Sequence, residues 1–156
     1  TKSYGFTLIE LMVVVGILAT MIGLATINLS GAQQKSSISA AVDVLISDMR
    51  EQQIKAMIGD TEGRAAASAY GVHFDTGQYV LFNGAYSSAE PSNFVVALPD
   101  TIKFDAVSRP EIIFERVTGE VYQFSSGPDK IILKNTTNVD TKTIIFNRYG
   151  VITDIN

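Results

Sequence analysis

One carboxylate lies inside the apolar segment near the start of the chain. Glu10 is followed by residues 11–34, none of which carries a charged side chain. A charge placed in a membrane costs at least about 2.5 kcal/mol on insertion scales, and a buried charge without a partner costs several kcal/mol. The next Lys or Arg is Lys35, about seven helical turns further along. We therefore expect a cation from elsewhere to meet Glu10.

Cleavage of the chain between Gly5 and Phe6 would supply such a cation. It would create an α-amino group four residues before Glu10, and a second molecule cut in the same way would offer the same amine. Either amine would neutralise the carboxylate in an apolar phase. Only the amine of a second molecule would make an assembly more stable than the isolated subunit.

The residues around this position resemble the class III signal sequence of type IV pilins and type II secretion pseudopilins. The resemblance rests on Lys2–Gly5, on Phe6–Glu10 and on the apolar run that follows. In that family a prepilin peptidase cuts after the Gly, the new N-terminal Phe is N-methylated, and the Glu aligns subunits in the filament. The resemblance therefore implies leader cleavage between Gly5 and Phe6, N-methylation of Phe6, and an assembly role for Glu10.

The resemblance also implies partners: other pilin or pseudopilin subunits in a homo- or hetero-filament, the prepilin peptidase, and an inner-membrane assembly platform. The apolar segment is long enough for a helix that crosses a bilayer core of about 30 Å, so membrane lipid is a further partner. Lys2 before the segment favours a cytoplasmic N-terminus. We expect a single-pass inner-membrane protein that then enters an extracytoplasmic or surface filament.

Two other interpretations of the apolar segment stay open. An ordinary signal peptide would end at a small residue, and Ala19 and Ala25 offer such sites. A generic single-pass anchor would require only the apolar run. Neither interpretation accounts for a carboxylate at the depth of Glu10.

Small residues recur within the apolar segment at a spacing that suits helix packing. Gly16 and Thr20 are four residues apart, as are Ala19 and Gly23, so each pair lies on one face of a helix. Small side chains let helices approach closely in an apolar medium. These four residues are therefore candidate helix-packing positions.

The pattern becomes amphipathic in the residues that follow the apolar segment. Apolar residues recur there at intervals of three and four: the predicted stripe comprises Ile38, Ala41, Val42, Leu45, Met49, Ala56 and Met57. Gly59-Asp60 ends the pattern, which predicts a helix from about Phe6 to Ile58, on the order of 80 Å long. The stripe is expected to pack on the following domain; a coiled-coil seam is the alternative.

These changes of pattern divide the chain of 156 residues into four expected segments. Residues 1–5 are the remnant of a leader peptide, and residues 6–29 form the transmembrane and filament-core helix. Residues 30–58 continue this helix, and residues 59–156 form a β-rich globular domain. The predicted fold class is α+β, in which a long N-terminal helix packs on a small, mostly antiparallel β-sheet domain, as in pilins.

Eight or nine short segments of the last hundred residues have the period-two pattern of strands. Tyr70–Asp75 and Gln78–Phe82 flank Thr76-Gly77, which predicts a hairpin. Further strands are predicted at residues 94–98, 102–104, 111–116, 120–124, 130–134, 143–147 and 151–155. The long polar stretch at residues 83–93 is predicted to be a loop.

A short stretch of the domain is repeated. Ile112–Arg116, before Gly119, is echoed thirty-two residues later by Ile144–Arg148, before Gly150. Two copies do not make a repeat array, so we interpret them as two similar hairpins. The order of elements over this region resembles the pseudopilin H and minor pilin T group.

Few residues suggest catalysis or metal binding. The chain has no cysteine and one histidine, His73, which alternates with Val72 and Phe74 and is therefore predicted to face solvent. The acidic residues near turns lack the close spacing of a Ca²⁺ loop. No nucleophile elbow or phosphate-binding loop is present in the sequence. We therefore expect no enzymatic activity, no cofactor and no metal.

The function that these observations favour is that of a structural subunit of a type IV pilus or of a type II secretion pseudopilus. The alternative is a DNA-binding minor pilin for DNA uptake, in which Lys130, Lys134, Lys142 and Arg148 would share a face. The net charge of −4 and the interleaved acidic residues argue against nucleic acid as a partner. Major pilin, minor pilin and pseudopilin are not separated by the sequence.

Overall fold

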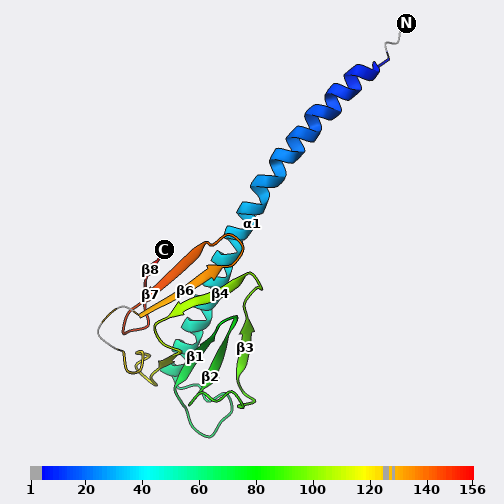
Figure 1. Ribbon diagram of the computed structural model, residues 1–156. Helices are drawn as coiled ribbons and strands as arrows, with labels where there is room; N and C mark the ends of the chain where they lie inside the picture. The colour runs from blue at the N-terminus through cyan, green and yellow to red at the C-terminus, as the bar shows by residue number, and fades with distance from the viewer. Residues whose placement is uncertain (1–4, 125–126, 128) are drawn as a thin grey trace. The chain divides into compact units, whose positions relative to one another are not determined.

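The computed structural model describes residues 5–124, 127 and 129–156, with the backbone alone for residues 24–36. The expected leader therefore lies outside the described residues, apart from Gly5. The chain divides into two compact units, Thr1–Ser36 and Ser37–Asn156, which are described separately. Helix α1 (Leu8–Ile58) begins in the first unit and ends in the second (Figure 1).

The apolar stripe of α1 in the second unit is buried. The prediction is confirmed at six positions, which are buried: Ile38, Ala41, Val42, Leu45, Met49 and Ala56. Met57 differs from the prediction, because its side chain is 48% exposed. The helix ends at Gly59, which has a φ of +66°. The Gly59 N–H donates to Ala56 and the Asp60 N–H donates to Lys55, as in a Schellman cap.

Sheet A contains the predicted hairpin. Its strands are β1 (Tyr70–Asp75), β2 (Gln78–Asn83), β3 (Phe94–Ala97) and β5 (Glu111–Phe114), in the order β3-β2-β1-β5. All neighbours in this sheet are antiparallel. The β1–β2 hairpin is confirmed, with Asp75 opposite Gln78 across Thr76-Gly77.

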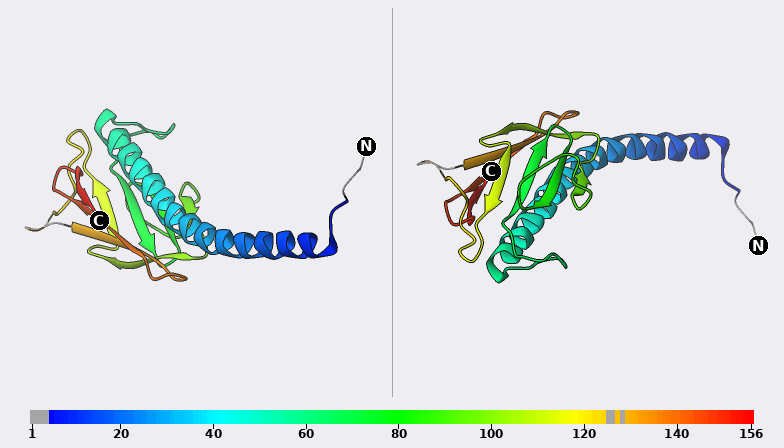
Figure 2. Two further views of the ribbon diagram at one scale, coloured as in Figure 1. Left: turned by 90° about the horizontal axis from the view of Figure 1, so that it is seen from above. Right: turned by 90° about the horizontal axis from the view of Figure 1, so that it is seen from below.

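Sheet B holds the remaining four strands: β4 (Ile102–Val107), β6 (Asp129–Asn135), β7 (Thr141–Phe146) and β8 (Ile152–Ile155), in the order β4-β6-β7-β8. Its strand pairs are also antiparallel. Figure 2 shows the strands of the second unit beside the C-terminal part of α1. The inner faces of both sheets and the stripe of α1 form one hydrophobic core in the second unit. The predicted α+β fold class is therefore confirmed.

The strand predicted at residues 120–124 is wrong. Only an isolated bridge forms, between Phe114 and Val121. The reason is that this backbone divides its hydrogen bonds among several partners. The Val121 N–H donates to Arg148, and the Tyr122 N–H donates to Ile113. The Arg109 guanidinium donates to the carbonyl oxygens of Tyr122 and Gln123. The first of the two echoed stretches is therefore not a two-stranded hairpin.

The two echoed stretches nevertheless lead to turns that contact the same side chain of α1. The Gln53 Nε2 donates to the carbonyl of Gly119 at 2.8 Å and to that of Tyr149 at 2.6 Å. Gly119 and Gly150 have φ values of +68° and +69°. A Cβ at Gly150 would lie 2.7 Å from the Gln53 Nε2 and 2.9 Å from Phe114. One helical amide thus holds two turns that are far apart in the sequence.

We predict that Gly150→Ala lowers the free energy of unfolding by about 1–3 kcal/mol, because an L side chain is strained at this φ and its Cβ would clash with Gln53. Urea unfolding followed by circular dichroism measures the change. Gly77→Ala is the matched control, since no described atom lies within 4 Å of its Cβ position. Equal losses for the two variants would contradict this account.

A buried tyrosine connects sheet A to α1. The Tyr79 side chain is fully buried, and its hydroxyl donates to Asp48 Oδ2. Burial, followed by the hydrogen bond to the Asp48 carboxylate, raises the pKa of Tyr79 well above its usual value. The unfolded chain therefore loses this phenolic proton at a lower pH than the folded chain does.

We predict that alkaline pH destabilises the protein through Tyr79. Because the folded pKa is the higher one, the stabilisation is present below about pH 10 and falls as the pH rises further, by up to about 1.4 kcal/mol per pH unit. Urea unfolding between pH 8 and pH 11 should show a shallower decline for Tyr79→Phe than for the unchanged protein. Identical slopes would contradict the prediction.

Candidate functional site

The first turn of α1 is closed by a reciprocal pair of side chains. The Thr7 N–H and hydroxyl donate to Glu10 Oε2 at 3.0 and 2.8 Å, and the Glu10 N–H donates to the Thr7 hydroxyl at 3.3 Å. This arrangement is a capping box, in which a residue at the helix start and one three positions later satisfy each other's backbone N–H groups. Glu10 therefore has a local partner that the sequence analysis missed, although the pattern Thr-x-x-Glu was visible.

The capping box does not provide Glu10 with a cation. Threonine supplies neutral donors, so the carboxylate keeps its negative charge at the start of the helix. The partial positive charge of a helix N-terminus favours a carboxylate there. Glu10 is exposed in this chain, so it remains accessible to a further partner.

Apolar side chains cover the helix after Glu10. Every large apolar side chain from Phe6 to Ile22 is at least 47% exposed, and Phe6 itself is 85% exposed. An apolar surface this extensive marks a region that meets a partner or a membrane. Within the residues that the structure describes, no helix has the length and apolarity needed to cross a membrane.

The four candidate helix-packing residues lie on this exposed part of α1. The Thr20 hydroxyl donates to the carbonyl of Ile17 at 2.8 Å, so its polar group is satisfied within its own helix. A Cβ at Gly16 or Gly23 would meet no described atom within 4 Å. These positions thus have room for a close neighbour.

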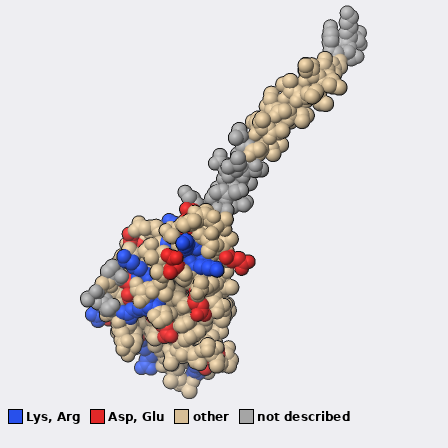
Figure 3. Space-filling model, in the orientation of Figure 1, with Lys and Arg blue, Asp and Glu red and all other residues tan. Residues whose placement is uncertain are grey.

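The four basic residues of the nucleic-acid alternative do not form one face. Lys130 and Lys134 lie on the outer face of β6. Lys142 of β7 lies opposite Leu133, which is buried, and cross-strand partners share one face, so Lys142 is on the inner face. Arg148 binds Glu120 through Nε at 2.9 Å and Nη2 at 2.7 Å. Acidic and basic side chains are interspersed on the surface seen in Figure 3. Because Lys142 is on the inner face, it lies on the opposite face of sheet B from Lys130 and Lys134.

His73 is more enclosed than the sequence predicts. It lies on the face of β1 opposite the core, but its ring stacks on Tyr86 at a centroid distance of 3.8 Å. Its Nδ1 lies 3.3 Å from Glu111 and its Nε2 lies 3.6 Å from Asp75. The prediction of its face is confirmed, but the side chain is only 18% exposed, because Tyr86 covers it. Tyr86 comes from a loop, and strand alternation cannot place a loop residue.

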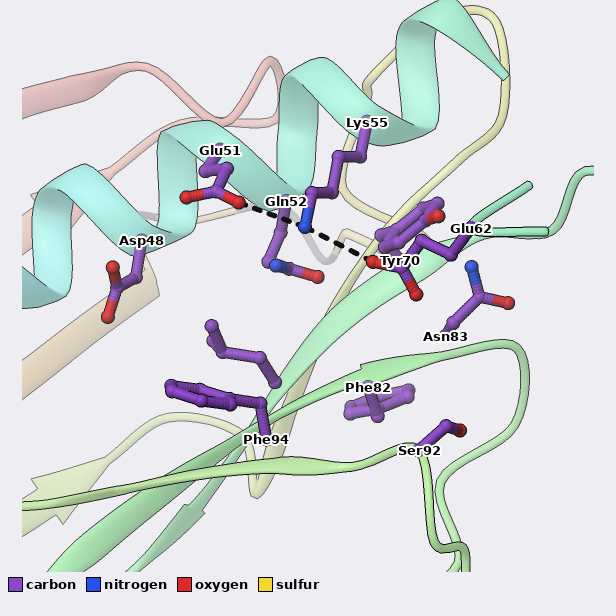
Figure 4. Close-up of a pocket in the computed structure, with 11 residues that line it drawn as sticks. Asp48, Glu51, Gln52, Lys55, Glu62, Tyr70, Phe82, Asn83, Ser92 and Phe94 are labelled. Carbon is purple, nitrogen blue, oxygen red and sulfur yellow. Dashed lines mark hydrogen bonds and ion pairs between the residues drawn. The ribbon is translucent and has the colours of Figure 1, made fainter. Parts of the chain in front are cut away.

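The sequence analysis also missed a polar pocket between α1 and sheet A (Figure 4). Gln52 lines this pocket, although its side chain is 97% buried. Gln52 lies between Met49 and Ala56 in the buried stripe of the helix. A polar residue within the apolar stripe of the helix was the sequence signal that could have identified Gln52 as a pocket residue.

The comparisons with known proteins bear on the N-terminal segment alone. Residues 1–26 match the family described as the prokaryotic N-terminal methylation motif. No curated protein and no solved structure matches the chain. The matched range includes Gly5, Phe6 and Glu10, and it ends within α1. The chain therefore carries, at its N-terminus, the class III signal motif that is typical of type IV pilin-like proteins.

Proposed function

We propose that the protein is a structural subunit of a type IV pilus or of a type II secretion pseudopilus. The observation that carries this proposal is the match of residues 1–26 to the N-terminal methylation motif. The α+β fold, with a helix that begins at Leu8 and two antiparallel sheets, is consistent with a pilin-like subunit. The role is assembly rather than catalysis.

The first step of this function is removal of the leader between Gly5 and Phe6 by a prepilin peptidase. Gly5 and Phe6 precede α1 and are exposed, so a peptidase can reach the bond between them. N-methylation of the Phe6 amine then follows. A methylated amine keeps its positive charge and remains able to pair with a carboxylate.

The second step is insertion and storage in the inner membrane, with the N-terminus in the cytoplasm. Residues 11–34 carry no charge, which supports an apolar environment for this part of the chain. Assembly would then transfer the exposed apolar side chains between Phe6 and Ile22 from lipid to the centre of a helix bundle. Because lipid is as apolar as the bundle, this transfer has no hydrophobic driving force of its own.

Assembly therefore depends on specific contacts. The Glu10 carboxylate pairing with the Phe6 amine of a neighbouring subunit is one such contact, since it removes an uncompensated charge from an apolar medium. Close packing at Gly16, Ala19, Thr20 and Gly23 is another. The partners are other pilin or pseudopilin subunits and an inner-membrane assembly platform.

The charge of Glu10 and its capping role can be separated by substitution. We predict that Glu10→Ala leaves the protein inserted and processed but poorly assembled. Glu10→Gln should fail equally, because Gln can complete a capping box but carries no charge. Thr7→Ala is the matched control: it removes the cap, keeps the charge and should still assemble. The measurement is the amount of subunit recovered in sheared or pelleted filaments.

Normal assembly of Glu10→Gln together with failure of Thr7→Ala would contradict the charge-pairing account. That pattern would assign Glu10 to the helix cap alone.

Cleavage is tested at the bond itself. We predict that Gly5→Leu blocks leader removal, because a bulky side chain would replace the hydrogen of the glycine at the cut. Intact mass spectrometry of the membrane fraction should then show a subunit that keeps its leader and an unmethylated Phe6. A mature, methylated mass in this variant would contradict the assignment of the site.

A further inference from the structure

The polar pocket in the second unit has the size and shape of a small-ligand site. It has a volume of about 430 Å³ and lies between the last turns of α1 and the β2–β3 side of sheet A. Ligand pockets in proteins usually have volumes of about 300–1,000 Å³. Figure 4 shows Glu51, Gln52 and Lys55 on the helix side of the pocket and Phe94 and Ser92 on the strand side.

Two amide side chains in this pocket are not fully satisfied by the protein. None of the hydrogen bonds of the described residues involves the Gln52 amide, although Gln52 is only 3% exposed. The Nδ2 of Asn83 is buried and makes no hydrogen bond of standard geometry among the described residues. The Tyr70 phenol lies close enough for a hydrogen bond with the Asn83 side chain to oppose the rise in the Tyr70 pKa. Polar groups of buried side chains are almost always paired, so the Gln52 amide, which faces the pocket without a protein partner, has capacity for a ligand, and Asn83 can add a second amide.

The charges of the pocket favour a neutral partner. Lys55 Nζ lies 2.9 Å from Glu51 and 3.1 Å from Glu62, so its charge is already compensated. Asp48 adds a third carboxylate to the lining. Arg64 lies 3.3 Å from Glu62, so the three carboxylates have two cationic neighbours, Lys55 and Arg64, and the remaining negative charge disfavours an anion. A cationic group would have to compete with Lys55 for the same oxygens. A fully apolar ligand would leave the two amides without partners.

An apolar surface forms the strand side of the pocket. Phe94 is 67% exposed at the start of β3, and Leu81 of β2 lies directly opposite it in the sheet. An exposed aromatic ring next to an aliphatic side chain offers a flat surface to a ring-shaped ligand. The ligand therefore needs one apolar face and several groups that can both donate and accept hydrogen bonds.

We propose that this pocket binds a neutral saccharide. The C–H face of a sugar ring would lie on Phe94, and its hydroxyl groups would bond with the amides of Gln52 and Asn83. Each hydroxyl can donate to a carboxylate and accept from an ammonium group at the same oxygen. That property suits a pocket in which Lys55 lies between two carboxylates. The binding site is additional to the assembly function and does not depend on it.

An extended peptide is the other class of ligand that the position allows, because β3 is an edge strand of sheet A. A peptide added to this edge would use the backbone of β3 and would gain little from the adjacent carboxylates and ammonium. Peptide N–H and C=O groups each act in one direction only, as donor or as acceptor. The mixed lining of the pocket therefore favours hydroxyl groups.

Ligand-observed saturation-transfer NMR on the full chain tests the proposal. The probes are glucose, galactose, N-acetylglucosamine and lactose, with the hexapeptide Lys-Thr-Val-Thr-Val-Thr as the competing class. The protein is kept in a phosphocholine detergent, because detergents with a sugar headgroup would compete for the site. We expect at least one saccharide to bind. Absence of saccharide binding would overturn the proposal, and binding of the hexapeptide alone would assign the pocket to a polypeptide.

Three variants locate the binding. Phe94→Ala and Gln52→Leu should each weaken saccharide binding by about tenfold or more. Val95→Ala is the matched control, because Val95 is also exposed but alternates to the other face of β3. Saccharide binding that persists in Phe94→Ala and Gln52→Leu would overturn the proposal.

The melting temperature of Gln52→Leu separates a binding role from a structural one. If Gln52 serves a ligand, replacing its unpaired amide with an apolar side chain should leave the melting temperature unchanged or raise it. A marked fall in the melting temperature would assign Gln52 to the fold instead. The comparison of Phe94→Ala with Val95→Ala decides the proposal even if Gln52→Leu does not fold.

Discussion

The apolar stripe of α1 between Ile38 and Ala56 packs in one core with both sheets. Sheet A and sheet B each bury an inner face, and the buried residues of both belong to one core with the stripe. Phe104 of β4 links the two sheets, because its N–H donates to the carbonyl of Thr76 and its ring meets Phe74 edge-on. The second unit has no other helix among its described residues, so both sheets depend on this one stripe for their cover.

Polar side chains of the same helix then determine how the sheets dock. Gln53 bonds to the turns at Gly119 and Tyr149, and Asp48 accepts from Tyr79. These bonds are directional, whereas apolar contacts tolerate rotation and sliding of the helix. Gln52 differs from Gln53 and Asp48, because its amide faces a pocket and not a protein partner. An unpaired amide lowers the stability of a protein if its role is purely structural. A ligand that forms hydrogen bonds with the amide of Gln52 would explain why this residue lies there.

The N-terminal part of the chain is stabilised by different interactions. Its apolar side chains are exposed in the single subunit, so their stability depends on surroundings that the subunit does not provide. A capping box satisfies the backbone N–H groups of Thr7 and Glu10 at the start of the helix. Threonine supplies no positive charge to Glu10, and under the proposed function the amine of a neighbouring Phe6 would supply it.

The features that depend on local pattern follow from the order of the amino acids. The methylation motif, the stripe of α1 and the β1–β2 hairpin could all be predicted, because side chains at a period of 3.6 or 2 identify both the element and the face that it buries. Even the capping box was visible in the spacing of Thr7 and Glu10. The same local pattern failed at residues 120–124, where β-forming residues share their backbone hydrogen bonds among Ile113, Arg148 and Arg109.

Which elements lie side by side depends on the packing of the whole domain. β4 pairs with β6, while β5, the next strand along the chain from β4, joins β1 in the other sheet, and neither choice follows from the composition of the strands. The shared contact of the two echoed turns with Gln53 and the cover of His73 by Tyr86 both join residues that are distant in the sequence. The same holds for Gln52 and Asn83, which line one pocket. Such contacts depend on the packing of the whole domain, because many alternative pairings have the same local pattern and differ only in how well the complete core is filled.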